Sequence, residues 1–227
     1  YNQTGTYNVK LIVTRSYGCT GEITLPAVVE PKPEAEILPI NNICAGMEVQ
    51  FAGRENKQLA GTKWHWKISP DKEYDVPAPP RLPFNTPGTH QVQLTISNGN
   101  GTCPDIAEST LEVNPPPALN PTPRQAAICQ GQSLELLANV DAGTAVTWTD
   151  YNISDPRAVV AVVRPEHDTV YHVMAENRYG CTKEADIAIT VTQPHTVNTG
   201  DAVICQGNQV QLNAGGATRY KWIPETG

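Results

Sequence analysis

The sequence predicts an all-β protein made of tandem β-sandwich domains joined by short Pro-rich linkers. The first supporting observation is a motif, Ile-Cys-x-Gly followed by an alternating strand, which begins at Ile43, Ile128 and Ile204 and recurs about every 80 residues. The second is the frequency of turn residues, 20 Pro and 17 Gly. The third is the lack of any long apolar segment with helical periodicity, so we expect almost no helix.

The composition limits the possible partners. The 227-residue chain has a net charge of −7, which disfavours nucleic acid and anionic membrane surfaces. It has no apolar run of about 18 residues, so we expect no membrane insertion in this segment. Its 6 Cys form no CxxC or Cys/His spacing, so we expect neither a metal site nor a cofactor. Their isolated, repeated positions favour disulfides and an extracellular location.

Residues 1–31 are expected to be the C-terminal hairpin of a truncated domain. Residues 5–13 alternate between apolar and polar side chains, as a half-buried strand does. A turn then leads to Cys19, and a second strand is expected at residues 22–29. Because a single hairpin is not stable alone, we expect the rest of this domain to lie upstream, so that the chain is an excerpt of a longer protein.

Residues 32–117 are expected to form a complete sandwich, after a stiff Pro-rich linker at residues 30–33. Trp64 and Trp66 are two residues apart, so they point to the same face of one strand. The Asn-Gly-Asn-Gly sequence at residues 98–101 fits a hairpin turn and precedes Cys103, as the earlier turn precedes Cys19. The expected strands are residues 34–38, 48–51, 63–68, 90–97 and 108–113, with a weak one within 74–84.

Residues 118–193 are expected to form a second complete sandwich, and residues 194–227 to begin a further one. A semi-rigid Pro-rich linker is expected at residues 114–123. The expected strands are residues 133–138, 145–149, 158–163, 169–176 and 185–192, and then 209–212 and a strand that ends at Trp222. Alignment of the repeats predicts that the core tryptophans are Trp66, Trp148 and Trp222.

Three features together resemble a known family: Cys-x-Gly before the second strand, the core Trp that follows it, and Gly-Thr-Tyr-x-Val-x-Leu-x-Val leading to Gly-Cys. Residues 1–19 and 83–103 resemble the C-terminal half of PKD domains, and residues 118–193 resemble the related bacterial Ig-like repeats. The resemblance implies an immunoglobulin-like (PKD-like) fold and no catalytic residues. Such repeats abound in large surface and secreted proteins of Bacteroidota, including gliding-motility adhesins exported by type IX secretion.

Two disulfide arrangements remain open. The simpler pairs cysteines within each domain, Cys44 with Cys103 and Cys129 with Cys181. In a Greek-key sandwich, however, these two turns lie at opposite poles, about 23 Å apart along a strand, whereas bridged Cα atoms lie within about 7 Å. This argument slightly favours a bond between Cys44 and Cys181 across the domain junction. The cysteines then expected to pair beyond this segment are Cys19, Cys103, Cys129 and Cys205.

The other candidate residues give weaker signals. His167 and His172 would lie on opposite faces of one strand, so we do not expect them to share a metal. His65 lies between two inward-facing tryptophans and is expected to face solvent. Thr169, in Asp-Thr-Val, fits the pattern of O-glycosylation in Bacteroidota. Trp64 is the best candidate for an exposed aromatic that stacks on a ligand, but extra core or junction packing is the interpretation that we favour.

These observations together predict a structural role. We expect a stalk or filament-shaft segment of a large extracellular surface adhesin, which projects a binding domain from the bacterial cell. The expected partners are neighbouring repeats of the same chain and other surface or filament proteins or glycans. The alternative is an accessory carbohydrate- or protein-binding module of a secreted multidomain hydrolase. The sequence has no Ser/His/Asp or Cys/His arrangement with an activating context, so we do not expect an enzyme.

Overall fold

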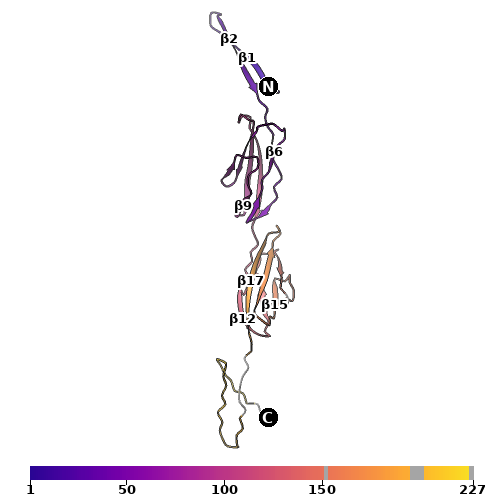
Figure 1. The fold of residues 1–227 in the computed structure, drawn as a ribbon, viewed down its shortest axis with the longest axis vertical. Coiled ribbons are helices and arrows are strands. Elements are labelled where there is room, and N and C mark those ends of the chain that lie inside the picture. The colour runs from indigo at the N-terminus through magenta and orange to yellow at the C-terminus, as the bar shows by residue number, and fades with distance from the viewer. Residues whose placement is uncertain (151–152, 195–201, 225–227) are drawn as a thin grey trace. The chain divides into compact units, whose positions relative to one another are not determined.

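The computed structural model describes residues 1–150, 153–194 and 202–224, which contain β-strands and no helix (Figure 1). The predicted all-β class of tandem Ig-like or PKD-like sandwiches is confirmed. Contacts divide the chain into two units. The first contains residues 1–116 and 179–181, and the second contains residues 117–178 and 182–227. Within the described residues, no helical segment has the length and hydropathy required to cross a bilayer.

The first unit begins with the predicted hairpin. β1 (Gly5–Thr14) pairs antiparallel with β2 (Thr20–Val29) over their whole length. The alternation found in the sequence does not bury one face here, since Leu11 and Ile12 are both more than half exposed. Two strands alone have no second layer against which to pack.

The five-stranded sheet of the first sandwich has the order β4-β11-β10-β7-β8. Neighbouring strands are antiparallel except β4 and β11, which are parallel. Along β10, every second residue is buried (Val92, Leu94 and Ile96), which is the pattern of a strand with one face on the core. The bounds are β4 (Ile43–Cys44), β7 (Lys63–Ile68), β8 (Lys72–Tyr74), β10 (Gly88–Ser97) and β11 (Asp105–Asn114).

The opposite layer of this sandwich contains four short strands. β3 (Ala35–Ile37) pairs with β6 (Gly53–Glu55), and β5 (Met47–Val49) pairs with β9 (Leu82–Phe84). The expected continuous strand at residues 48–51 is therefore shorter, and it resumes as β6 after a break of three residues. Side chains from both layers form one core, centred on the fully buried Trp66.

The second unit contains the other complete sandwich. Its larger sheet has the order β12-β17-β16-β14, and its smaller sheet pairs β13 with β15. Trp148 is 2% exposed and lies in a core that both sheets share. The bounds are β12 (Gln125–Cys129), β13 (Leu134–Leu137), β14 (Ala145–Trp148), β15 (Val160–Val163), β16 (Thr169–Glu176) and β17 (Thr182–Thr192).

The two strands and the core tryptophan predicted for the last segment are wrong in this structure. No strand forms at residues 209–212 or before Trp222, and the Trp222 side chain is 53% exposed rather than in a core. A strand requires a neighbour for its backbone hydrogen bonds, and a core Trp requires a second layer. None of the described residues provides either of these to residues 202–224.

Candidate functional site

A disulfide joins Cys44 to Cys181, with an S–S distance of 2.03 Å and a Cα–Cα distance of 5.5 Å. Cys44 is the last residue of β4, and Cys181 lies in the turn between β16 and β17. Contact grouping places the Tyr179–Cys181 segment with residues 1–116. Of the two arrangements that the sequence left open, the structure therefore contains the bond between cysteines of consecutive sandwiches.

Strand register explains why Cys44 does not pair with Cys103. β4 runs parallel to β11, and Cys44 is opposite Asn114, the last residue of β11. Cys103 lies just before the first residue of β11. Since β11 has 10 residues, the two cysteines are about 30 Å apart along the strand, and a disulfide requires less than about 7 Å.

The second sandwich repeats this geometry. Cys129 ends β12 and is opposite Thr192, the last residue of β17, whereas Cys181 directly precedes β17. A bond between Cys129 and Cys181 is therefore excluded by the same separation, and the within-domain arrangement is wrong. The two short parallel strands, β4 and β12, determine this result, and the sequence analysis did not predict either of them.

The other four cysteines are thiols in the structure. Cys103 is half-buried, while Cys19, Cys129 and Cys205 are exposed. Cys19 and Cys103 lie in the hairpin turns β1–β2 and β10–β11, the positions that correspond to Cys181. In each complete sandwich, the early cysteine (Cys44 or Cys129) therefore ends a short parallel strand. The late cysteine (Cys103 or Cys181) lies in the last hairpin turn.

The linker before the first sandwich is fixed by polar contacts. The Glu30 carboxylate accepts hydrogen bonds from the side chains of Asn98, Asn100 and Thr102 in the β10–β11 turn, with the Asn100 and Thr102 bonds both at 2.6 Å. These bonds, that of Thr102 first, lower the pKa of Glu30 below 4.5, because they stabilise the ionised form. Residue 30 is therefore held to the sandwich by its side chain as well as by the stiffness of the prolines.

Asp105 anchors the next part of the linker. Its carboxylate lies 2.7 Å from Lys32 Nζ and accepts a hydrogen bond of 2.9 Å from the backbone N–H of Ala35. The contact with Lys32, followed by that with Ala35, lowers the pKa of Asp105. The sequence did not predict either anchor, because the bonded residues are distant along the chain. Glu30 and Asn100 are 70 residues apart, and so are Asp105 and Ala35.

His65, His172 and Thr169 have ordinary structural partners. His65 faces outward, as predicted, and its Nδ1 lies 2.7 Å from Asp75 Oδ1. His172 Nδ1 lies 2.7 Å from Asp186 Oδ1 on the neighbouring strand. Thr169 begins β16, and its hydroxyl donates to the His167 carbonyl at 2.7 Å. Within the described residues, no three His, Cys, Asp or Glu side chains form a group that could hold a metal.

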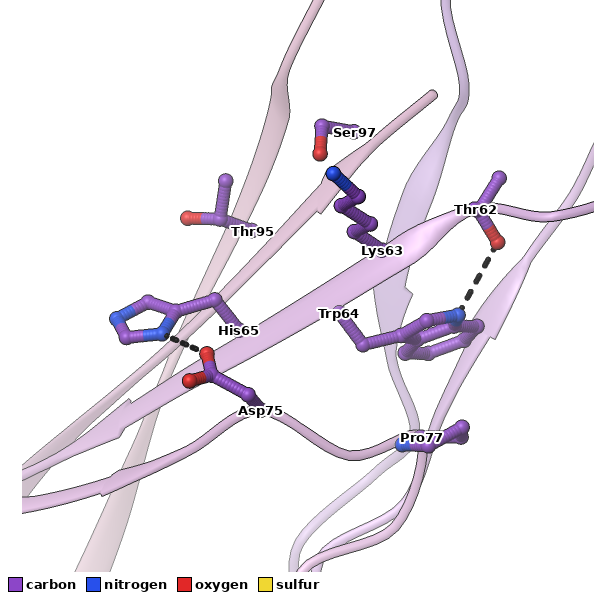
Figure 2. Close-up of a pocket in the computed structure, with 8 residues that line it drawn as sticks. All are labelled: Thr62, Lys63, Trp64, His65, Asp75, Pro77, Thr95 and Ser97. Atoms are coloured by element: carbon purple, nitrogen blue, oxygen red, sulfur yellow. Dashed lines mark hydrogen bonds and ion pairs between the residues drawn. The ribbon is translucent and has the colours of Figure 1, made fainter. Parts of the chain in front are cut away.

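Trp64 lies at the margin of the first core and also lines a surface cavity of about 500 Å³ (Figure 2). It is partly buried and packs against the core, which is the interpretation that the sequence favoured. Its indole N–H donates to the Thr62 hydroxyl at 3.1 Å. The cavity combines residues 62–65 of the β7 region with Asp75, Pro77, Thr95 and Ser97.

Comparison with protein families finds one match. Residues 30–113 match the PKD domain family, which covers the first complete sandwich. A comparison with curated proteins finds no match.

Solved structures with Ig-like or fibronectin-like modules are similar to the chain in fold. A Bacteroides ovatus protein, the mixed-linkage glucan utilization locus SGBP-B in complex with a mixed-linkage heptasaccharide, is 17% identical, with a TM-score of 0.28 over 69% of this chain and 47% of its own. The Clostridium thermocellum CbhA fibronectin(III)-like modules are 13% identical, with a TM-score of 0.34 over 70% of this chain and 95% of theirs. The eight N-terminal Ig domains of DSCAM are 14% identical, with a TM-score of 0.37 over 82% of this chain and 28% of theirs.

The chain thus spans about half or less of the length of the Bacteroides protein and of DSCAM. PKD and Ig-like sandwich repeats are typical of extracellular proteins, and so is a disulfide. Residues 30–113 thus match the PKD domain family, in a chain of tandem Ig-like β-sandwiches.

Proposed function

We propose that this chain is a structural segment, a stalk or filament shaft, of a large extracellular surface adhesin. Its role is mechanical: it carries a binding domain away from the cell and transmits force along the array. It performs no catalysis and needs no cofactor. Its partners are neighbouring repeats of the same chain and other surface or filament proteins or glycans.

The observation that supports this proposal most is the Cys44–Cys181 bond. A disulfide within a domain stabilises that domain only, whereas this one links the cysteines of two consecutive sandwiches. Tension applied to the chain can therefore pass through a covalent bond without loading the residues between the two cysteines. A shaft under load benefits from this connection, and an isolated catalytic or binding module does not need it.

The recurrence of the cysteines extends the argument to an array. The position of Cys44 recurs at Cys129, and the position of Cys181 recurs at Cys103 and Cys19, in equivalent strand ends and turns. If each early cysteine pairs with the late cysteine of the following repeat, every junction carries one disulfide. The fixed Glu30 and Lys32 side chains, together with the prolines, stiffen the linker segment at the start of the PKD domain.

We further propose that the parent protein is an adhesin of the Bacteroidota gliding-motility type, exported by type IX secretion. The support is the resemblance of the repeats to those of such adhesins. The full-length gene tests this: many further repeats and a type IX export signal are expected. A hydrolase domain within a few hundred residues would instead support the second candidate, an accessory binding module, which the cavity beside Trp64 favours.

The mechanical proposal is tested by a non-reducing disulfide map of the native full-length protein. We expect a linked peptide that contains Cys44 and Cys181, and linked peptides between the early and late cysteines of consecutive repeats. Peptides linking Cys44 to Cys103, or six free thiols in the secreted protein, would contradict the covalent array. The matched variant Cys44→Ser should lose only the bond to Cys181.

A further inference from the structure

The cavity beside Trp64 arises where β8 stops following β7. β8 pairs only with residues 66–68 of β7, and after Tyr74 the chain leaves the strand. Residues 62–65 and the segment that contains Asp75 and Pro77 then line an open surface cavity. Its volume of about 500 Å³ is within the range of about 300–1,000 Å³ that is usual for small-molecule sites.

One end of the cavity is aromatic. Figure 2 shows the Trp64 ring at this end, together with Thr62 and Pro77. The hydrogen bond from the indole N–H to Thr62 satisfies the polar atom of the ring and fixes its orientation. The ring therefore needs no further polar partner, and an apolar group can lie against it.

The other end is polar. His65 and Asp75 form their pair there, with Thr95 close by in the same view (Figure 2). The register of β7 and β10 places Thr95 opposite His65 and Ser97 opposite Lys63. Three half-buried hydroxyls (that of Thr62 at the aromatic end), one ammonium group, one carboxylate and one imidazole therefore line a single cavity.

The charges within the cavity balance. Lys63 contributes one positive charge and Asp75 one negative charge, so neither a strongly anionic nor a strongly cationic ligand is favoured. The lining instead offers both donors and acceptors beside an aromatic face. A neutral sugar has matching chemistry, because its hydroxyl groups donate and accept while the C–H face of its ring is apolar.

We infer that this cavity of the PKD domain binds a neutral oligosaccharide. One sugar ring stacks on Trp64 at the edge of β7, and the hydroxyls of an adjacent sugar unit hydrogen-bond on the outer face of the sheet to Asp75, Thr95, Ser97 and Lys63. This inference adds a binding role to a domain whose proposed role is mechanical. It does not depend on the disulfide, since a cavity that binds no sugar would leave the Cys44–Cys181 map unchanged.

The test uses the ¹⁵N-labelled 227-residue chain titrated with cellohexaose, xylohexaose and mannohexaose, each to about 10 mM, a concentration that detects even millimolar affinity. NMR resolves the indole N–H groups of the 4 Trp, and Trp64→Phe assigns that of Trp64. We expect at least one of the hexasaccharides to shift the Trp64 resonance saturably.

Variants locate the site. Trp64→Ala should weaken binding by about tenfold or more, and Asp75→Asn should weaken it less. Lys67→Ala is the matched control, because Lys67 is exposed on the same strand but lines a different cavity. It should bind as the unchanged chain does. Trp64 also packs against the core, so its replacement can affect folding as well as binding. The double variant Thr95→Val, Ser97→Ala therefore provides a second test, because it removes two hydroxyl groups on the outer face of the sheet.

Three results would overturn the inference. The first is that none of the three hexasaccharides shifts the Trp64 resonance. The second is that the double variant and Lys67→Ala bind the sugar equally well. The third concerns an acidic ligand. If an acidic oligosaccharide binds instead, and Asp75→Asn strengthens that binding, the cavity is an anion site and the neutral-sugar assignment is wrong.

Discussion

Cys44 and Cys181 form a disulfide with Cα atoms 5.5 Å apart, although 137 residues separate them in the sequence. The bond closes a loop that contains most of both complete sandwiches. Tension between the chain ends can pass from residue 44 to residue 181 through this bond, and the residues inside the loop then remain unstretched.

Force spectroscopy should detect this loop directly. When the chain is unfolded by its two ends, the oxidised form should be shorter at full extension by roughly 450–490 Å, the length of the 137 bypassed residues. Cys44→Ser or a reductant should restore the missing length.

Cys129→Ser serves as the control for this measurement. Cys129 is an exposed thiol at the equivalent strand end of the second sandwich, so its loss should leave the shortened length unchanged. An unreduced chain that reaches full extension would show that the bond is absent in solution.

Gly53 permits the close contact between β6 and the first core. A Cβ atom at this position would lie 2.5 Å from Leu94 Cδ2 and 3.0 Å from both Trp66 Cζ2 and the Glu36 carbonyl. Since Trp66 and Leu94 are fully buried, they have little room to move. Gly53→Ala should therefore destabilise the PKD domain by about 1–3 kcal/mol, as measured by denaturant unfolding.

Gly21→Ala is the matched control for that substitution. Gly21 is also in a strand, and a Cβ there would lie 3.6 Å from a Val13 methyl group, an ordinary van der Waals distance. It should change stability little. Equal effects of the two substitutions would mean that backbone freedom, rather than steric contact, determines the cost.

The two core tryptophans differ in one hydrogen bond. The indole N–H of Trp148 donates to the Ala158 carbonyl at 2.9 Å, whereas the buried N–H of Trp66 has no partner among the described residues. Replacement by Phe removes similar apolar area at both sites. Trp148→Phe should therefore cost about 1 kcal/mol more than Trp66→Phe, because it also leaves the Ala158 carbonyl unpaired.

Native-state hydrogen exchange can measure these costs separately, since it reports the opening free energy of each sandwich. Slowly exchanging amides of β10 report on the first core, and those of β16 report on the second. A larger cost for Trp66→Phe would show that the indole of Trp66 has a polar partner in solution.

Local periodicity predicted most of the strands. β7 and β16 have the predicted bounds, because each has unbroken alternation between turn signals. The recurrence of Trp at the same place in each repeat correctly predicted that Trp66 and Trp148 lie in cores. The same alignment wrongly predicted a core position for Trp222. Among the described residues, no second layer of strands packs against this side chain. Repetition therefore predicted the type of each element but not whether a partner layer would be present.

Contacts between distant residues could not be predicted from local pattern. β4 has only two residues, and it is a strand only because the distant β11 pairs with it. The cavity beside Trp64 requires Asp75 and Pro77, which lie in an irregular Pro-rich segment without periodicity. Sequence reasoning identified Trp64 as a candidate, but it could not supply the other residues that line the cavity.

The His172–Asp186 pair should make the second sandwich slightly sensitive to pH. The hydrogen bond that His172 donates to the Asp186 carboxylate, followed by the charge of Asp150, raises the pKa of His172 above 6.5. The folded state thus favours protonated His172, so the stabilisation is fully present below about pH 6.5 and is lost as pH rises through the higher folded pKa. Because both side chains are more than half exposed, the effect should be well under about 1 kcal/mol.

An NMR titration of the His172 ring tests this shift. The midpoint should lie above that of an unfolded peptide and should fall in Asp186→Asn, which removes the strongest cause of the shift. Glu135→Gln changes an exposed carboxylate on β13 that does not contribute to the shift, so it should leave the midpoint unchanged. A midpoint that is the same in Asp186→Asn would mean that the 2.7 Å contact is not maintained in solution.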